Sequence, residues 1–211
     1  MKIIDGNALA QTIKDKIKEE VKRLPVKPGL AAVLVGKNPA SKVYITQKSV
    51  VCEYLGFYLE KYELNENVSE QQLIGLIERL NENKAIHGIL VQLPLPKHMN
   101  KQHVLERIKP AKDVDGSHLL SPFVPCTAKS ILCLLKEVTS LEGKHAVIVG
   151  RSNIVGKPTA MLLLDANATV TVCHSKTNNL AHYTRQADIL VVAAGKQKLI
   201  TAEMEIGRAH V

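Results

Sequence analysis

The sequence lacks tryptophan, has few other aromatic residues and carries no long apolar run. Its 211 residues include only two phenylalanines and five tyrosines. No apolar stretch approaches the ~20 residues that a transmembrane helix needs, which excludes a membrane-spanning protein. The first residues contain neither the apolar core nor the small-residue cleavage site of a signal peptide. We therefore expect a cytoplasmic protein.

Cysteine is scarce and scattered. The chain has four cysteines, Cys52, Cys126, Cys133 and Cys173, and no two of them form a CxxC pair. This spacing suits the reduced thiols of a cytosol better than a disulfide framework or a zinc site. We expect no structural metal.

The chain is neither neutral nor acidic overall, because its formal net charge is +8. The lysines near the N-terminus alternate with acidic residues, which is typical of a solvated helix face. No basic run is interleaved with aromatic residues of the kind that stack on single-stranded bases. A nucleic-acid binder remains a possible reading that the dispersed lysines disfavour. Hydrophobic residues make up 45% of the chain and charged residues 23%, as in a globular protein.

The first half of the chain alternates helical and strand patterns. Apolar runs of strand length are flanked by glycine and proline, and segments with helical spacing begin at capping residues. We expect helices over 7–24, capped by Asn7, and over 39–55, a helix opened by a capping box at Ser69–Gln72, and a short helix near 103–108. We expect strands over 30–35, 57–64 and 86–93, and the continuous apolar run of 30–35 suggests a strand buried on both faces. Such alternation with short connections predicts an α/β fold with helices packed on a mostly parallel sheet.

A second unit begins after a proline-containing segment, and we place the domain boundary near residues 120–126. Beyond it we expect helices over 127–138, 156–165 and 178–185, and strands over 145–149, 169–173 and 189–193. This βαβαβ order is half of a dinucleotide-binding fold.

A glycine turn joins the first strand of that unit to its helix. Gly150 and Gly156 stand at its two ends, and Ser152 takes the place of a middle glycine. Such a turn lets backbone N–H groups approach a pyrophosphate at a helix N-terminus. The spacing excludes a P-loop. A plain strand-to-helix turn remains the alternative.

The second strand of the unit ends without an acidic residue. An NAD-preferring fold usually has Asp or Glu there, to accept a hydrogen bond from the ribose 2′-hydroxyl. Ser175, Lys176 and Thr177 occupy this position, and Arg151 lies in the glycine turn. Hydroxyls and cations can bind a 2′-phosphate, which points to NADP. On position alone, Ser175 could equally be an ordinary turn residue.

Tyr44 and Lys48 lie one helical turn apart, on a stripe that continues through apolar Val51 and Leu55. Apolar surroundings would desolvate the lysine ammonium and ease proton exchange near neutrality. A lysine snorkelling from the edge of an amphipathic helix is the alternative.

Five segments together resemble the bifunctional methylenetetrahydrofolate dehydrogenase/cyclohydrolase family. They are Tyr44-Ile45-Thr46-Gln47-Lys48, Val91-Gln92-Leu93-Pro94-Leu95-Pro96, Asp113-Val114-Asp115-Gly116, Pro125-Cys126-Thr127 and the stretch from Gly150 to Pro158. The resemblance covers nearly the whole chain, and it favours functional roles for Lys48 and Ser175. It implies oxidation of 5,10-methylenetetrahydrofolate by NADP and hydrolysis of the product to 10-formyltetrahydrofolate.

The resemblance also implies which residues do this. Lys48 matches the proton-transfer residue, Gln92 would tune it, Tyr44 would pack against the folate and Asp115 would hold the pterin ring. Val91 and Leu93 would complete the folate site. NADP would be bound by Gly150, Arg151, Ser152, Ile154, Gly156, Ser175 and Thr177. The family's proteins lead us to expect a homodimer with tetrahydrofolate derivatives as partners.

The chain departs from the family in several places. The connection between Gly116 and Pro125 is short, and Ala128 replaces a proline. The family's later glycine-rich segment and terminal helix are not found, and residues 205–211 match the translation of a sequencing adapter. We therefore expect a folate-site domain at 1–123, an incomplete Rossmann-like NADP-binding domain at 124–204 and a non-native tail at 205–211. A folate- or NADP-binding fragment without turnover is the alternative function.

Overall fold

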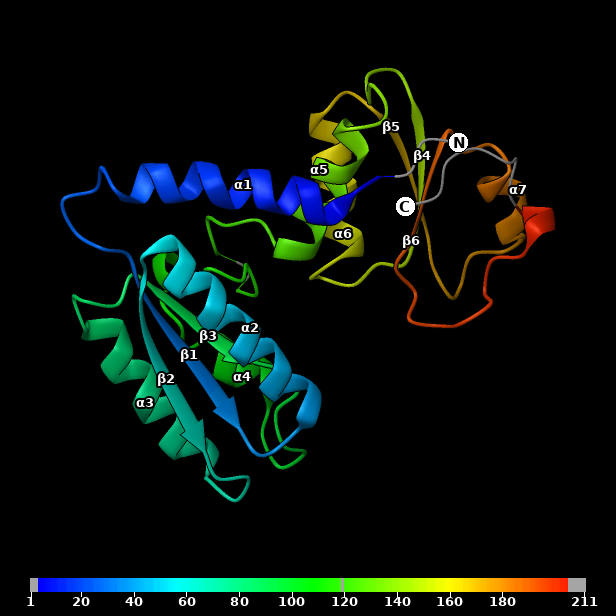
Figure 1. Ribbon diagram of the computed structural model, residues 1–211. Coiled ribbons are helices and arrows are strands. Elements are labelled where there is room, and N and C mark those ends of the chain that lie inside the picture. The colour runs from blue at the N-terminus through cyan, green and yellow to red at the C-terminus, as the bar shows by residue number, and fades with distance from the viewer. Residues whose placement is uncertain (1–3, 119, 205–211) are drawn as a thin grey trace. The chain divides into compact units, whose positions relative to one another are not determined.

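The computed structural model describes residues 4–118 and 120–204, which fall into two compact units (Figure 1). One unit spans residues 7–123, and the other spans 124–204 together with 4–6. Each contains a three-stranded parallel sheet with helices against it. The expected α/β class with two parallel sheets is confirmed. In this part of the chain no helix is long and apolar enough to cross a bilayer.

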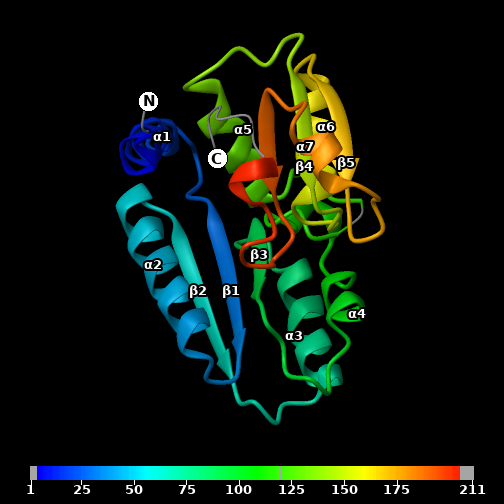
Figure 2. The same ribbon diagram turned by 90° about the vertical axis from the view of Figure 1, so that its right-hand side faces the viewer.

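The 7–123 unit has the strand order β2-β1-β3. Its strands are β1 (Gly29–Val35), β2 (Tyr58–Leu64) and β3 (Gly88–Gln92). Its helices are α1 (Gly6–Val21), α2 (Pro39–Leu55), α3 (Glu70–Glu82), α4 (Lys101–Leu105) and the 3₁₀ turn η1 (Pro110–Lys112). Figure 2 shows α2 and α3 on opposite faces of the sheet. The central strand β1 is therefore apolar on both faces.

The two faces of β1 belong to different hydrophobic clusters. Ala31, Val33 and Val35 pack with α3 and α4, whereas Ala32 and Leu34 pack with Ile45 of α2. Alternate residues of a strand point to opposite faces, so one continuous apolar run serves both layers. The interpretation of 30–35 as a strand buried on both sides is confirmed.

Capping residues fix the helices that flank the site. The Asn38 side chain accepts a hydrogen bond from the Ser41 N–H, and Pro39 opens α2. Gly56 ends this helix with a left-handed φ of 80°. Ser69 and Gln72 form the expected capping box of α3. These caps make the start and end of both helices readable from the sequence.

Several boundaries differ from the expectation. Helix α1 begins at Gly6 and ends at Val21, so Asn7 lies inside its first turn rather than capping it. Helix α4 covers Lys101–Leu105 because Asn100, whose side chain accepts from the His103 N–H, caps it earlier than expected. Strand β3 begins at Gly88, later than Ile86.

The 124–204 unit has the order β5-β4-β6, with strands β4 (His145–Val149), β5 (Thr169–Cys173) and β6 (Ile189–Val192). Its helices are α5 (Cys126–Lys136), α6 (Gly156–Asp165), α7 (Leu180–Thr184) and the 3₁₀ turn η2 (Ala202–Met204). Ala146 and Ile148 of β4 face one hydrophobic cluster, and Val147 and Val149 face another. The expected tail at 205–211 lies outside the described residues.

Candidate active site

Lys48 and Gln92 meet at the carboxyl end of β3. Lys48 is carried by α2, and its Nζ donates to Oε1 of Gln92 at 3.0 Å. Gln92 is the last residue of β3, and its Nε2 donates to the Leu93 carbonyl at 2.9 Å. The second hydrogen bond turns the amide so that its oxygen faces the lysine. The structure thus brings together two side chains that lie far apart in the sequence.

The first turn of α2 is fastened to the same loop by Ser41. This serine is buried, and its hydroxyl donates to the Leu93 carbonyl at 3.2 Å. The contact fixes the helix that carries Lys48 against the end of β3. Sequence reasoning missed Ser41, although its place in the turn capped by Asn38 was a usable signal.

The other predicted folate residues occupy different surroundings. Tyr44 lies one turn before Lys48 and is 56% exposed, so its ring is free to contact a ligand. Val91 is 4% exposed and belongs to the hydrophobic core. Its side chain therefore supports β3 rather than offering a ligand surface. Leu93 is half-buried in the loop that follows β3.

Asp115 lies in a turn beside β3. Asp113 pairs with Ile89 of β3 in the parallel sense, so the chain leaves the sheet in the direction of Gln92. Gly88 makes this approach possible, because a Cβ there would lie 2.7 Å from Cγ1 of Val114. Asp115 is half-buried, and its Oδ2 lies 3.5 Å from the Ser117 hydroxyl. Its carboxylate has further acceptor capacity for a ligand amino group.

A buried thiol lies one helical turn beyond Lys48. Burial raises the pKa of the Cys52 thiol, and the positive charge of Lys48 acts in the opposite direction. Cys52 is buried in the interior face of α2. Lys48 therefore has a buried thiol beside it on its own helix, at a position that the predicted stripe through Val51 and Leu55 did not include.

The glycine turn of the 124–204 unit depends on the absence of side chains. A Cβ on Gly150 would lie 2.4 Å from the Ala193 carbonyl oxygen, and Gly150 has a φ of 132°. A Cβ on Gly156 would lie 2.1 Å from the carbonyl oxygen of Gly150. Both distances are too short for a Cβ atom, so only glycine fits at these two positions. The two glycines let β4, β6 and the start of α6 approach closely.

Ser152 closes the N-terminus of α6. Its hydroxyl accepts hydrogen bonds from the backbone N–H groups of Val155, at 3.2 Å, and Gly156, at 3.3 Å. The Ser152 side chain therefore caps the helix, because Val155 at the cap position has no side-chain oxygen. A serine at this position of the turn is explained by the helix itself.

A cavity of about 500 Å³ opens beside this turn. Four of the seven predicted cofactor residues line it: Gly150, Arg151, Ser175 and Thr177. Ser152, Ile154 and Gly156 are not among the lining residues in the described part of the chain. The lining also includes residues that sequence reasoning missed, namely Val149, His174, Leu180, Ala193, Ala194, Lys196 and Leu199. Their common signal was their place at the carboxyl ends of β4, β5 and β6 or in the segments that follow.

The turn after β5 is ordered by its own hydrogen bonds. The His174 N–H donates to the Thr177 hydroxyl oxygen at 2.8 Å, and the Thr177 N–H donates to the His174 carbonyl at 2.8 Å. Ser175 lies between them on the cavity wall. Burial raises the pKa of the neighbouring Cys173 thiol, which a hydrogen bond involving Thr177 partly offsets.

The lining residues fit a phosphorylated dinucleotide. Arg151 and Lys196 supply positive charge, Ser175 and Thr177 supply hydroxyls, and none of the described lining residues is acidic. The glycines leave the backbone accessible at the helix end. Within residues 4–118 and 120–204, no three His, Cys, Asp or Glu side chains are placed together to hold a metal ion.

Both units match family models. Residues 4–115 match the tetrahydrofolate dehydrogenase/cyclohydrolase catalytic domain, and residues 125–211 match the NAD(P)-binding domain of the same enzymes. Among curated relatives, the bifunctional protein FolD of Halalkalibacterium halodurans is 49% identical over 95% of this chain and 76% of its own. That of Nitrosospira multiformis is 50% identical over 96% and 75%, respectively.

Solved structures agree with the sequence matches. The bifunctional enzyme FolD of Campylobacter jejuni superposes with a TM-score of 0.93 at 46% identity, over 97% of this chain and 78% of that one. The Trypanosoma brucei enzyme, solved with NADP and an inhibitor, gives a TM-score of 0.90 at 37% identity, over 99% and 77%. The chain therefore spans about three quarters of the length of these relatives.

Proposed function

The chain belongs to the tetrahydrofolate dehydrogenase/cyclohydrolase family, and from this premise we propose which of its residues carry out the two reactions. The protein oxidises 5,10-methylenetetrahydrofolate with NADP and hydrolyses the 5,10-methenyl product to 10-formyltetrahydrofolate. The observation that carries the assignment of roles is the hydrogen bond from Lys48 to Gln92 at the end of β3.

The first reaction needs alignment more than acid–base chemistry. NADP, when bound, supplies the hydride acceptor. Two folate nitrogens stabilise the cation that remains on the substrate, so no strong base is required. Tyr44, exposed one turn from Lys48, packs against the folate, and Asp115 accepts hydrogen bonds from the pterin amino group. Together they hold the substrate in position.

The second reaction requires proton transfer. Addition of water to the methenyl carbon releases a proton and leaves a hydroxyl on that carbon. When the bond to the departing ring nitrogen breaks, that nitrogen gains a proton and the hydroxyl loses its proton to solvent as the formyl carbonyl forms. Lys48 takes up the proton from the added water and donates it to the departing nitrogen. Gln92, turned toward Lys48 by its bond to the Leu93 carbonyl, holds the Nζ in place. Val91 supports this end of the strand from the core and Leu93 borders the site.

In the second unit, Arg151, Ser175 and Thr177 bind the 2′-phosphate side of NADP, and the turn from Gly150 to Gly156 faces the pyrophosphate. The cationic and hydroxyl lining of the cavity supports this assignment. Ser152 and Ile154 contribute to NADP binding by holding the conformation of the turn, and Ser152 does so by capping α6. We accordingly assign residues 1–123 to folate binding and catalysis and residues 124–204 to NADP binding.

We further propose that the protein acts as a cytoplasmic homodimer whose other partners are folates, not nucleic acid or membranes. Exposed apolar side chains on α2, Val43 at 56% and Val50 at 62% exposure, support a self-association surface. The thiols of Cys52, Cys133 and Cys173, which form no disulfide, support a reducing compartment. Light scattering of the purified protein tests the dimer.

The experiment for the proposed roles replaces Lys48 by methionine and measures both activities. We expect Lys48→Met to lower the cyclohydrolase rate by about 10²-fold to 10⁴-fold, the usual contribution of a general acid–base group. Lys42→Met, an exposed lysine of the same helix, is the control and keeps its rate. Near-normal hydrolysis of methenyltetrahydrofolate by Lys48→Met would overturn the role.

The same assay addresses the alternative of a binding fragment without turnover. The relatives match 95–96% of this chain, which does not favour that alternative. Tight binding of NADP and folate with neither reaction detectable in the unmodified chain would restore it.

A further inference from the structure

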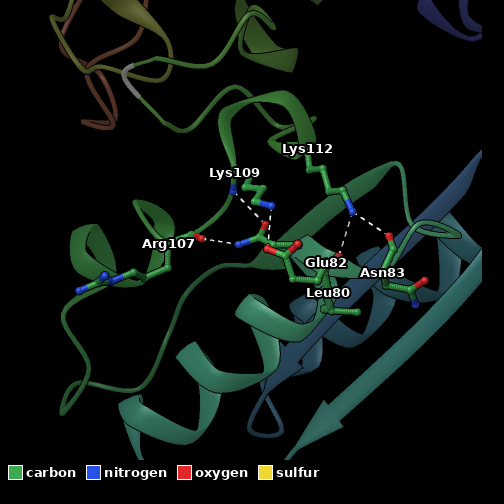
Figure 3. Close-up of polar contacts among 7 residues, drawn as sticks. Leu80, Glu82, Asn83, Arg107, Lys109 and Lys112 are labelled. Atoms are coloured by element: carbon green, nitrogen blue, oxygen red, sulfur yellow. Dashed lines mark hydrogen bonds and ion pairs between the residues drawn. The ribbon is translucent and has the colours of Figure 1, made fainter.

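The segment before Asp115 is fastened to the C-terminal end of α3 (Figure 3). Asn81, a buried residue in the last turn of that helix, holds the segment with both ends of its amide. Its Nδ2 donates to the Arg107 carbonyl at 2.8 Å, and its Oδ1 accepts from the Lys109 N–H at 2.9 Å. One side chain thus ties two points of the returning chain to the helix.

Lys112 makes a second attachment a few residues later. Its Nζ donates to the carbonyl oxygens of Leu80, at 3.0 Å, and Asn83, at 2.8 Å (Figure 3). Each of these carbonyls also accepts from a backbone N–H group, and the helix dipole favours the positive charge of Lys112 beside them. Burial lowers the pKa of Lys112, and the charge of Lys109 adds to this. The ammonium is therefore held at the helix end, partly away from water.

The anchored segment leads directly into the turn that carries Asp115. The next residue, Asp113, is buried and pairs with β3. Its Oδ2 accepts from the His118 N–H at 2.7 Å, and its carbonyl accepts from the Ser121 hydroxyl at 3.0 Å. Asp115 therefore projects from a short turn whose two sides are both fixed, and Lys112 links that turn to a rigid helix.

We propose that Lys112 is a positioning residue for folate binding, acting through Asp115. By capping α3, it sets where the 113–116 turn meets the sheet and hence where the Asp115 carboxylate meets the pterin amino group. The proposal rests on the proposed role of Asp115. It assigns to Lys112 a part in substrate affinity, whereas a purely structural cap would affect stability alone.

The test compares Lys112→Met with Lys109→Met in the full chain. Lys109 is the matched control, because its Nζ pairs with Glu82 at 2.7 Å on the surface, where both side chains are exposed. A displacement of about 1 Å can cost up to about 10²-fold in activity. We expect Lys112→Met to raise the KM for both folate substrates about 10-fold while the dissociation constant for NADP stays within about 2-fold. Lys109→Met leaves all of these values unchanged.

A double-mutant cycle separates positioning from stability. In an Asp115→Ala background, Lys112→Met is expected to add no further increase in folate KM, because its effect passes through the missing carboxylate. Effects that multiply would overturn the proposal. A lower melting temperature with unchanged folate KM would also overturn it.

Failure of the proposed function gives a different result. If Asp115→Ala alone leaves the folate KM unchanged, the role of Asp115 is wrong. If Asp115→Ala raises the KM but Lys112→Met behaves like Lys109→Met, only the positioning role is wrong. Should Lys112→Met fail to fold, Lys112→Gln, which keeps an N–H donor but loses the charge, enters the same comparisons with the same expected direction.

Discussion

The two units have the same sheet topology, but their candidate sites are built from different features. In each, the first strand of the unit is central, in the orders β2-β1-β3 and β5-β4-β6. In the 7–123 unit the candidate groups are side chains joined by hydrogen bonds, such as Lys48 with Gln92. In the 124–204 unit the site depends on space, because Gly150 and Gly156 leave no room for a Cβ. The Lys48–Gln92 pair is therefore damaged by removing side-chain atoms, whereas the turn from Gly150 to Gly156 is damaged by adding them.

The largest loss of NADP binding, and the clearest test of this difference between the units, is expected from Gly156→Ala. The added methyl would lie 2.1 Å from the Gly150 carbonyl oxygen, so the turn must move. We expect NADP affinity and NADP-dependent oxidation to fall by about 10²-fold, as misplacements of about 1 Å can cause. Hydrolysis of methenyltetrahydrofolate, which uses no NADP, should continue. Titration with NADP and separate assays of the two reactions measure this.

Gly75→Ala is the control for adding a methyl group. Gly75 lies inside α3, and a Cβ there meets only the end of the Arg79 side chain at 3.9 Å. We expect this variant to keep both activities and to gain about 0.5–1 kcal/mol in stability. The contrast between the units breaks down if Gly156→Ala binds NADP as well as the unmodified protein does.

A smaller effect is expected from Arg151→Ala. Hydrogen bonds to charged groups contribute about 1.5–3 kcal/mol, so we expect NADP to bind about 10-fold to 100-fold more weakly. NAD, which lacks the 2′-phosphate, should change by no more than about 2-fold. Arg185→Ala serves as the control, since Arg185 lies in the same unit and bonds to the Glu203 carbonyl instead. Equal losses for NADP and NAD would contradict the assignment.

The smallest predicted effect is a dependence of stability on pH through the carboxyl group of Glu70. In the 7–123 unit, Glu70 lies 2.7 Å from the His103 ring nitrogen. The hydrogen bond from His103, followed by that from the Asn100 N–H, lowers the pKa of Glu70. A carboxyl whose folded pKa is below its unfolded value stabilises the fold above the unfolded pKa, about 4.3, and loses this as the pH falls through the folded pKa.

We therefore expect Glu70→Gln to melt at a lower temperature than the unmodified protein at neutral pH and to match it below both pKa values. Thermal melts across this pH range measure the difference. Glu78→Gln, an exposed change on the same helix, is the control. A difference that stays constant with pH would show that the ion pair does not contribute.

Local chemistry made much of the fold readable from the sequence. Asn38 with Pro39, Gly56 and the Ser69–Gln72 box each mark a helix end through a bond to the nearby backbone. The apolar run of β1 predicted a strand buried on both faces because nothing polar interrupts it. The boundaries of α1 and α4 were wrong, because α1 begins before Asn7 and because Asn100, which caps α4, was not recognised as a cap.

The site was less readable, because its contacts join distant segments. The apolar stripe along α2 does not reveal that Ser41 bonds to the Leu93 carbonyl or that Lys48 reaches Gln92. Val91 belongs to a motif that suggests a ligand contact. Because alternate side chains of β3 point to opposite faces, however, the Val91 side chain points into the hydrophobic core. Lys196 follows β6 with no motif of its own, and only the assembled sheet places it at the cavity.

The shared strand order has a consequence for where ligands bind at all. In each sheet the chain leaves the central strand toward one neighbour and returns on the other side, so the connections after adjacent strands diverge. Such a topological switch point opens a crevice at the carboxyl ends of the strands. Lys48 and Gln92 lie at the one between β1 and β3, and Gly150 and Ala193 at the one between β4 and β6. The strand order thus places both candidate sites at switch points, whichever reactive residues the loops carry.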